Sequence, residues 1–268
     1  DFLVTPNHKL FISIVRDIWQ VKTAEECEKY SKIITKGSVE WNGEEIKELY
    51  NYKTDNFLQF IGYYLADGTL GKGMVRFGLT KIWKIKKVIS CLDILNLKYS
   101  IYSSKGGQTK ITINDTKLVK YLKENFGHKS ENKKIPRELL NLSKRQLNLL
   151  FDVLMFDGYV DDRENRTSMT YTTTSEALKD AFQEIAIKMG LSTKINQYIG
   201  TGFNPKCKYF NILLSEGKEK HIAKENMTRV KYEGNVYCFS TSTGFYITRR
   251  NGCIAIQGNT ATETKADG

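Results

Sequence analysis

The chain has 268 residues, of which 40% are hydrophobic and 12% aromatic, so it can bury a core and is long enough for one large or two modest domains. Forty-one Lys and Arg against thirty Asp and Glu give a formal net charge of +11, which favours a polyanion as partner, with a membrane surface as the rival. No apolar run approaches the length of a membrane span, and DFLVTPNHKL at the start has neither a cationic leader nor a signal core. We therefore expect a cytoplasmic protein with no membrane partner, and the five isolated cysteines argue against a zinc site or a disulfide framework.

The first and last segments share a β-rich character. VTPNHKLFI near the start and NVYCFSTSTGFYITRRNGCIAIQGN near the end consist of short candidate strands punctuated by Gly and Asn. They predict a small β domain into which the middle of the chain is inserted. The residues after Gly258 show no periodicity and no apolar anchor, which indicates either a frayed terminus or a segment that is meant to be released.

The middle of the chain contains an internal repeat. FIGYYLADGTL at 60–70 and LFDVLMFDGYV at 150–160 are apolar helical runs that each close on Asp-Gly. A strand, a helix and two further strands follow each copy. We therefore predict that one unit, roughly helix-strand-helix-strand-strand, occurs twice.

The predicted strands have one apolar and one polar face. The apolar positions are Tyr99, Ile101, Ile111 and Ile113 in the first unit, and Ile195 and Ile199 in the second. A solvated outer face would explain the polar positions of any single strand. Their repetition in both halves of a basic chain favours a cradle for double-stranded DNA. The candidate DNA-binding residues are Lys98, Ser100, Tyr102, Gln108, Lys110, Thr112, Lys194, Asn196 and Tyr198.

Each helical run ends on an acidic residue at the same step of the repeat. A glycine in the left-handed conformation that ends a helix would by itself explain Asp-Gly. Pairing of the two helices would instead bring Asp67 and Asp157 together, and two adjacent carboxylates need a bridging cation. Mg²⁺ takes oxygen ligands and assists phosphodiester cleavage, so we predict a magnesium site formed by both aspartates.

GYYLADG at 62–68 and the second copy resemble the paired dodecapeptides of LAGLIDADG homing endonucleases, although Asp152 stands where a second packing glycine is expected. The resemblance implies two sheets saddling duplex DNA and one metal-binding acidic residue per half. KKIP at 133–136 is similar to a family segment that places an active-site lysine, which implies that role for Lys133 rather than that of an ordinary loop lysine. Repeat spacing suggests Lys231 as its twofold equivalent.

The flanks resemble those of an intein, a Hint-fold splicing domain that can carry a homing endonuclease. TPNH is similar to the T-x-x-H splicing block, with Thr5 and His8, although a lone histidine on a β segment is more often structural. Cys238 stands where many inteins carry an aspartate, and its thiol could tune proton transfer or act as an auxiliary nucleophile. Asn259 would cyclise and release the following chain, and Thr260 would first receive the upstream chain as an ester.

The resemblance implies a division at 1–50 (first part of the Hint domain), 51–224 (endonuclease), 225–259 (last part of the Hint domain) and 260–268 (host extein sequence). The amino-terminal splicing block is absent upstream of Thr5, so a missing amino-terminal intein segment is an expected partner, and the chain is either a fragment or one piece of a split intein. The expected fold is an α/β LAGLIDADG endonuclease with a pseudo-twofold repeat, inserted in a mainly-β Hint domain. The expected function is protein splicing at Asn259-Thr260 with Mg²⁺-dependent site-specific DNA cleavage. The alternatives are a free-standing homing endonuclease and a non-cleaving DNA-binding or RNA maturase relative.

Overall fold

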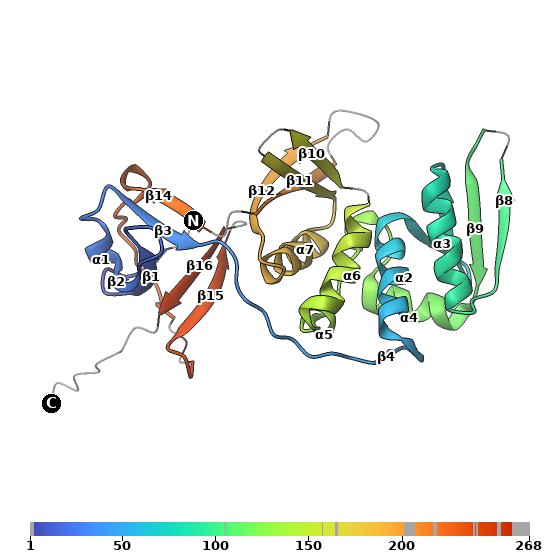
Figure 1. Cartoon of the computed structure of the whole chain (residues 1–268), viewed down its shortest axis with the longest axis horizontal. Helices are drawn as coiled ribbons and strands as arrows, with labels where there is room; N and C mark the ends of the chain where they lie inside the picture. The colour runs from blue at the N-terminus through green and yellow to red at the C-terminus, as the bar shows by residue number, and fades with distance from the viewer. Residues whose placement is uncertain are drawn as a thin grey trace.

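The computed structural model describes residues 3–258, apart from 105, 157, 164–165, 201–206, 217–218, 238, 240 and 251–252. Two helix-and-sheet units lie side by side, and a third sheet lies beside the second unit (Figure 1). None of the helices in the described part of the chain is long and apolar enough to cross a membrane.

The two units have the same order of elements and the same strand order. The first consists of α2 (Thr54–Asp67), β6 (Gly68–Gly71), β7 (Met74–Leu79), α3 (Ile82–Ile94), β8 (Tyr99–Ser103) and β9 (Thr109–Asn114), in the sheet order β6-β7-β9-β8. The second consists of α6 (Lys144–Met155), β10 (Tyr159–Arg163), β11 (Arg166–Thr173), α7 (Glu176–Lys188), β12 (Ser192–Ile199) and β13 (Lys208–Ser215), in the order β10-β11-β13-β12. The predicted repeat is therefore confirmed, with one addition: a strand, β6 or β10, directly follows each central helix.

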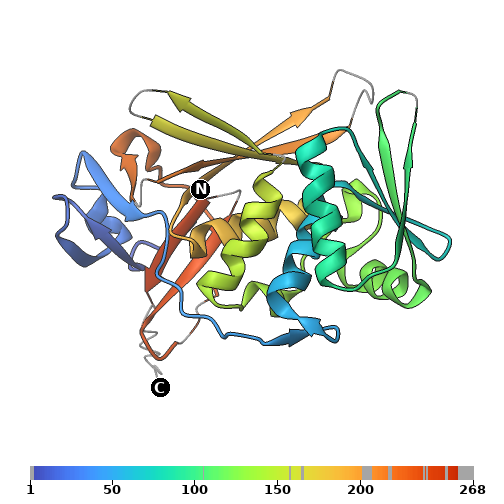
Figure 2. The same cartoon turned by 45° about the vertical axis from the view of Figure 1, so that its right-hand side comes forward.

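The central helices α2 and α6 pack against each other, with one sheet on each side of the pair, as Figure 2 shows. The α2 helix is apolar on nearly every face because it is enclosed by α3, α6 and its own sheet. Gly62 permits the close crossing, since a Cβ atom there would lie 2.7 Å from Cβ of Val153. Asp152, at the position where the resemblance expects a second packing glycine, is exposed and accepts a hydrogen bond from Asn148 (3.0 Å).

The Asp-Gly helix ends are not left-handed caps. Gly68 has φ −72° and ψ 140°, so the chain passes from α2 directly into β6 in an extended conformation. Glycine is needed there for close approach, because a Cβ atom would lie 2.7 Å from the Tyr64 carbonyl oxygen. The capping explanation of Asp-Gly is therefore wrong for the first copy, and the aspartate sits at a helix-to-strand junction.

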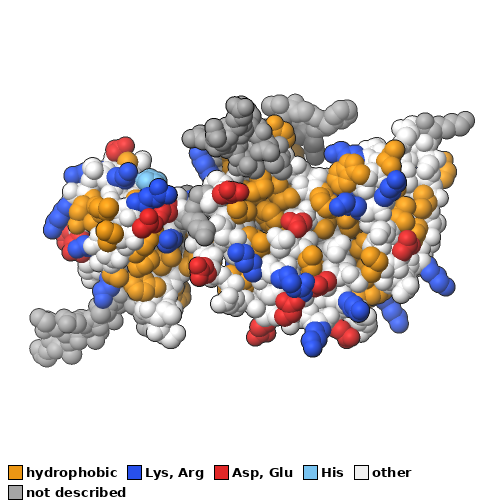
Figure 3. All heavy atoms as spheres, viewed as in Figure 1, with side chains coloured by type: hydrophobic (Ala, Val, Ile, Leu, Met, Phe, Trp, Pro, Cys, Tyr) orange, Lys and Arg blue, Asp and Glu red, His pale blue; other side chains and the backbone are white. Residues whose placement is uncertain are grey.

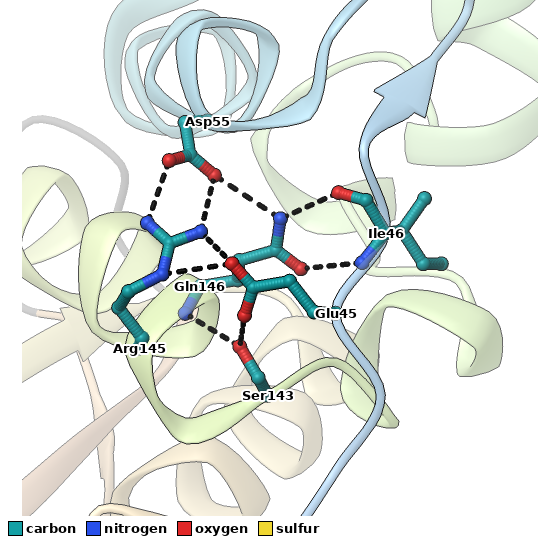
Figure 4. Close-up of polar contacts among 6 residues, drawn as sticks. All are labelled: Glu45, Ile46, Asp55, Ser143, Arg145 and Gln146. Atoms are coloured by element: carbon teal, nitrogen blue, oxygen red, sulfur yellow. Dashed lines mark hydrogen bonds and ion pairs between the residues drawn. The ribbon is translucent and has the colours of Figure 1, made fainter.

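A polar network ties the amino-terminal ends of α2 and α6 to the preceding segment (Figure 4). Arg145 pairs with Glu45 and donates to Asp55 from Nη1 (2.6 Å). The buried amide of Gln146 meets both the backbone N–H and C=O of Ile46, at 3.0 and 2.6 Å. The network therefore joins the amino-terminal ends of α2 and α6 to one segment, and Asp67 lies at the opposite end of α2.

The elements between the two units are α4 (Thr116–Phe126), η1 (Ser130–Asn132) and α5 (Arg137–Leu140). A short hairpin of β4 (Glu48–Leu49) and β5 (Tyr52–Lys53) precedes the first unit.

The remaining sheet is built from both ends of the chain. Its order is β14-β3-β1-β16-β15, with β2 paired to β1. These strands are β1 (Lys9–Ser13), β2 (Trp19–Thr23), β3 (Lys32–Lys36), β14 (Glu219–Ala223), β15 (Phe245–Arg250) and β16 (Cys253–Gly258), accompanied by α1 (Ala24–Cys27) and η2 (Lys224–Asn226). The two repeated units are thus inserted between strands of one sheet, which we call the terminal sheet.

The terminal sheet and the segment after β3 are hydrogen bonded to backbone carbonyls of the second unit. Lys220 Nζ donates to the Thr193 carbonyl (2.6 Å), and the Val39 N–H donates to the Ile187 carbonyl (3.3 Å). Its own core is small and contains Leu10, Ile12, Cys27 and Ile33, whereas one large cluster spans both repeated units.

Candidate functional site

Asp67 lies at the carboxyl end of α2, where the two units meet. Its side chain is 27% exposed, and its carboxylate pairs with the ammonium group of Lys84 from α3, whose side chain is buried. Lys84 was not predicted, although the sequence pattern indicates it. Lys84 shares the buried face of α3 with Val88 and Cys91, one and two turns further on. A lysine on an otherwise apolar helix face indicates a buried partner of opposite charge.

Lys133 lies against the same helix end. The side chain is buried, and Nζ donates to the carbonyl oxygens of Tyr64 (2.7 Å), Leu65 (2.9 Å) and Gly68 (2.9 Å). These carbonyls belong to the last turn of α2 and to its C-cap, where backbone acceptors generally lack a helical partner. The three N–H groups of the ammonium thus fix the junction that carries Asp67.

Lys133 also joins the two units through its backbone. Its carbonyl accepts a hydrogen bond from Ser175 Oγ (2.5 Å), and Ser175 is the N-cap of α7. Lys133 thus lies between the two units, with its side-chain donors directed at backbone carbonyls, and its role as an active-site lysine stays a prediction.

Lys231 is not the twofold equivalent of Lys133. It lies beyond β14 in the irregular segment after η2, its side chain is almost fully exposed, and its ammonium pairs with Glu233 (3.3 Å). Counting along the repeat failed here because the chain leaves the second unit after β13 and enters the terminal sheet at β14.

A pocket of about 240 Å³ opens beside the end of α2, on the side of the second unit. Polar and apolar residues of both units contribute to its lining. The lining residues are Leu65, Ala66, Ser130, Lys133, Tyr171, Thr172, Thr173, Thr174 and Leu178. The lining is mainly apolar, and two of its polar groups already have partners: Lys133 Nζ donates to backbone carbonyls at the end of α2, and Thr173 Oγ1 accepts from the Ser175 N–H (3.2 Å).

The predicted magnesium site is described only in half. Asp157 lies outside the described residues, and within the described part of the chain no group of three His, Cys, Asp or Glu side chains could hold a metal ion. The carboxylate of Asp67 is a suitable hard ligand and is partly open to solvent, and the described charged group that pairs with it is the ammonium of Lys84.

The outer face of the first sheet carries the predicted polar residues in ordered rows. Cross-strand partners place Thr69, Arg76, Thr112 and Ser100 in one row, and Gly78, Lys110 and Tyr102 in the next. Gln108 lies over Gly78, since its Nε2 is 3.2 Å from where a Cβ would be, and Lys98 is exposed just before β8. Arg76 of β7 lies on the same face but was not predicted, because no faces were assigned to that strand from the sequence. Ile101, predicted to be on the apolar face, is 49% exposed because β8 is an edge strand.

The outer face of the second sheet is more neutral. Lys194, Asn196 and Tyr198 share it, as predicted, with Thr172 and Asn211 in the same row as Asn196. Thr172 Oγ1 is hydrogen bonded to Asn211 Oδ1 (2.9 Å), and the Tyr198 ring stacks on Tyr209 at 5.4 Å. Ile199, predicted to be apolar-facing, is 67% exposed because it is the last residue of edge strand β12.

The candidate splicing residues are described only at the amino-terminal end. The Thr5 carbonyl accepts from the His8 N–H (3.0 Å), and Thr5 Oγ1 is hydrogen bonded to Asn7 (2.8 Å). His8 is buried and hydrogen bonded to Gln257 of β16; burial lowers the pKa of His8, and the Gln257 contact opposes that shift. Cys238, Asn259 and Thr260 lie outside the described residues.

Comparison with known proteins gives distant similarities. No family model matches the chain. It is 25% identical over 172 residues to the ATP-dependent DNA helicase Hel308 of Thermococcus kodakarensis, covering 58% of this chain and 15% of that protein. It is 31% identical over 143 residues to the DNA-directed RNA polymerase subunit Rpo1C of Methanocaldococcus jannaschii, covering 52% and 16%. The chain thus spans about a sixth of the length of the curated relatives it matches.

Among solved structures, the chain is similar to I-DmoI in complex with DNA and Mn, with a TM-score of 0.43 and 15% identity over 60% of this chain and 90% of that one. It is also similar to the N-terminal LAGLIDADG domain of DUF199/WhiA, with a TM-score of 0.43 and 11% identity over 76% and 87%. Full-length DUF199/WhiA from Thermatoga maritima gives 0.43 and 11% over 63% and 53%. At these values the similarities do not assign an activity to the chain.

Proposed function

We propose that the repeated units form a LAGLIDADG-type DNA endonuclease that binds duplex DNA and cleaves both strands in a divalent-metal-dependent reaction. The observation that carries this proposal is the placement of Asp67 and Lys133 at one end of the helix pair, between two sheets with polar outer faces. A basic chain with that arrangement suits a polyanion whose backbone passes over the helix ends.

Each described group has a physical task in this proposal. Lys84 orients the carboxylate of Asp67, and Lys133 holds the helix-to-strand junction rigid. Asp67, with Asp157, would hold Mg²⁺, which when bound would activate water and stabilise the leaving oxygen.

The sheets would read the DNA on either side of the cleavage positions. Arg76 and Lys110 on the first sheet are suited to phosphates and guanine edges, whereas Asn196 and Asn211 on the second sheet are suited to adenine edges. Binding should therefore weaken steeply with salt, because neutralised phosphates release counterions.

The test is a cleavage screen on high-complexity genomic DNA with Mg²⁺, in which new duplex ends are captured by adapters and sequenced. We expect one recurrent long site, cut on both strands. The Asp67→Asn/Lys84→Met variant, which removes both charges of the pair together, should bind that site without cutting it. Glu124→Gln, on the exposed face of α4, is the matched control and should cut like the wild type.

Two results would contradict the proposal. Selective binding by the wild type without cleavage would support the non-cleaving relative, and the absence of both binding and cleavage would exclude DNA as the substrate.

A second candidate function, protein splicing, is favoured by the terminal sheet. Strands from residues 9–36 and 219–258 form one sheet around the inserted units, and His8 reaches Gln257, two positions before Asn259. In this proposal 1–50 and 219–259 form the Hint domain, 51–218 the endonuclease, and 260–268 belong to the host. The boundary predicted at 224 moves to before β14 because that strand pairs with β3 of the terminal sheet. Cyclisation of Asn259 would release the following chain, with Thr260 as acceptor and His8 assisting the first acyl shift.

Splicing is tested by supplying an amino-terminal segment and measuring intact masses. Asn259→Ala should block release, whereas Thr260→Ala should block ligation and still allow release. Ligation by the Thr260→Ala protein would contradict the assigned roles.

A further inference from the structure

The first turn of α3 presents an apolar surface to solvent where the two units meet. Ile82 is 70% exposed and Trp83 is 44% exposed, and we call these two residues the seam patch. Figure 3 shows hydrophobic side chains interspersed with Lys and Arg side chains over the region of α3. Adjacent exposed Ile and Trp side chains are costly in water and mark a contact surface more often than a scattered exposed residue does.

Contacts on both sides place the seam patch between the two helix ends. The Trp83 ring meets the Phe156 ring edge-on, with centroids 5.6 Å apart, and Phe156 is the C-cap of α6. The next residue in α3, Lys84, pairs with Asp67 at the end of α2. The patch therefore lies between the end of α2, which carries Asp67, and the C-cap of α6, which precedes Asp157 in the sequence.

The fold does not require an apolar pair at this place. The N-caps Lys81 and Ser175 occupy equivalent positions in α3 and α7, so Ile82 and Trp83 correspond to Glu176 and Ala177. Glu176 is exposed and pairs with Lys208 at the surface. The second unit thus builds the same helix start from a charged and a small residue, and the apolar pair is a property of the first unit alone.

The charge around the seam patch is positive. Lys81 Nζ lies 5.9 Å from the centroid of the Trp83 ring, and Lys87 Nζ lies 4.5 Å from that of Phe156. The first turn of α3 contains no acidic residue. A partner that combines negative charge with flat apolar surfaces is a nucleic-acid duplex, whose phosphates border stacked bases.

We propose that the seam patch contacts the bases of bound DNA from the minor groove between the two cleavage positions, with Ile82 and Trp83 as a wedge that unstacks one base step. This rests on the proposed DNA endonuclease function. The wedge widens the step at the middle of the site, and the bend brings the flanking duplex onto the two polar sheet faces. Because only the first unit carries it, the distortion is asymmetric about the centre of the site.

The test uses the duplex recovered from the cleavage screen, in EDTA so that it stays intact, with 2-aminopurine at each central step in turn. We expect 2-aminopurine emission to rise at one step on binding, and Trp83 emission, obtained as wild type minus Trp83→Phe, to be quenched. Ile82→Ser/Trp83→Ala should abolish the rise and weaken binding about tenfold, with an unchanged salt dependence, because the lost contact is to bases and not to phosphates.

Ile94→Ala is the matched control, since Ile94 is an exposed apolar residue at the other end of the same helix. It should keep the affinity and the emission change. Tight binding by the wild type with no 2-aminopurine response, or an unchanged affinity of the double variant, overturns the wedge while leaving the endonuclease intact. Concentration-dependent dimerisation that the double variant loses would assign the patch to a second copy of the chain instead, and would also overturn it.

Discussion

Substitution of Asp67 by asparagine, the obvious test of a catalytic aspartate, is expected to destabilise this protein. The carboxylate is an ion-pair partner of Lys84, whose ammonium is buried in α3, so Asp67→Asn removes a counter-charge from a buried cation. Removing one partner of a buried ion pair costs about 3–5 kcal/mol, and we take about 3 kcal/mol because Asp67 is partly exposed. For 268 residues unfolding together, an unfolding entropy of about 2.1 cal/mol/K per residue converts this into a fall in Tm of about 5 °C.

The double variant separates stability from chemistry. Asp67→Asn/Lys84→Met removes both charges and keeps a similar volume, so we expect its Tm to return to within about 2 °C of the wild type. Differential scanning calorimetry of the wild type, both single variants and the double variant gives the interaction free energy directly. If Asp67→Asn melts at the wild-type temperature, or if the two substitutions are additive, the pair does not stabilise the fold and our account of Lys84 is wrong.

Three further predictions concern the supports of the site. Gly62→Ala should lower the free energy of unfolding by about 1–2 kcal/mol although alanine favours helices, because its Cβ meets Val153. Val153→Ala should destabilise the wild type yet stabilise the Gly62→Ala protein. If chemical denaturation shows that Val153→Ala changes the stability in the same direction in both backgrounds, the close crossing is refuted. Lys133→Met should cost about 3 kcal/mol by leaving three carbonyls without their donor, whereas Lys134→Met, at an exposed neighbour, should have little effect in the same urea titration. Burial lowers the pKa of His8 from its ordinary 6.5, so as the pH falls the unfolded chain takes up the proton before the folded chain does. The contribution of His8 to stability should therefore be fully present above about pH 6.5 and fall as the pH drops below it. His8→Gln should remove this pH dependence from a series of thermal melts, and an unchanged dependence of Tm on pH would count against a buried neutral imidazole.

Local sequence pattern was sufficient for the elements of the repeat. The apolar run that ends at Asp67 becomes α2, and the alternation at Ile111 and Ile113 places those side chains inward with Lys110 and Thr112 on the outer face. These features follow from periods of 3.6 and 2 residues, which a single sequence displays. The same alternation failed at Ile101 and Ile199, because whether an apolar face is covered depends on the neighbouring element and both residues lie on edge strands.

The sequence by itself determined that one unit occurs twice, that an acidic residue follows the apolar run of each copy, and that both ends of the chain form short strands. Only the tertiary structure decided that Lys84 pairs with Asp67, that Lys133 turns its donors to the end of α2, and that strands from both ends join in one sheet. The physical reason is that each of these contacts joins elements distant in sequence. Their partners are set by how helices cross and strands pair, whereas residue spacing along the chain reports only local periodicity.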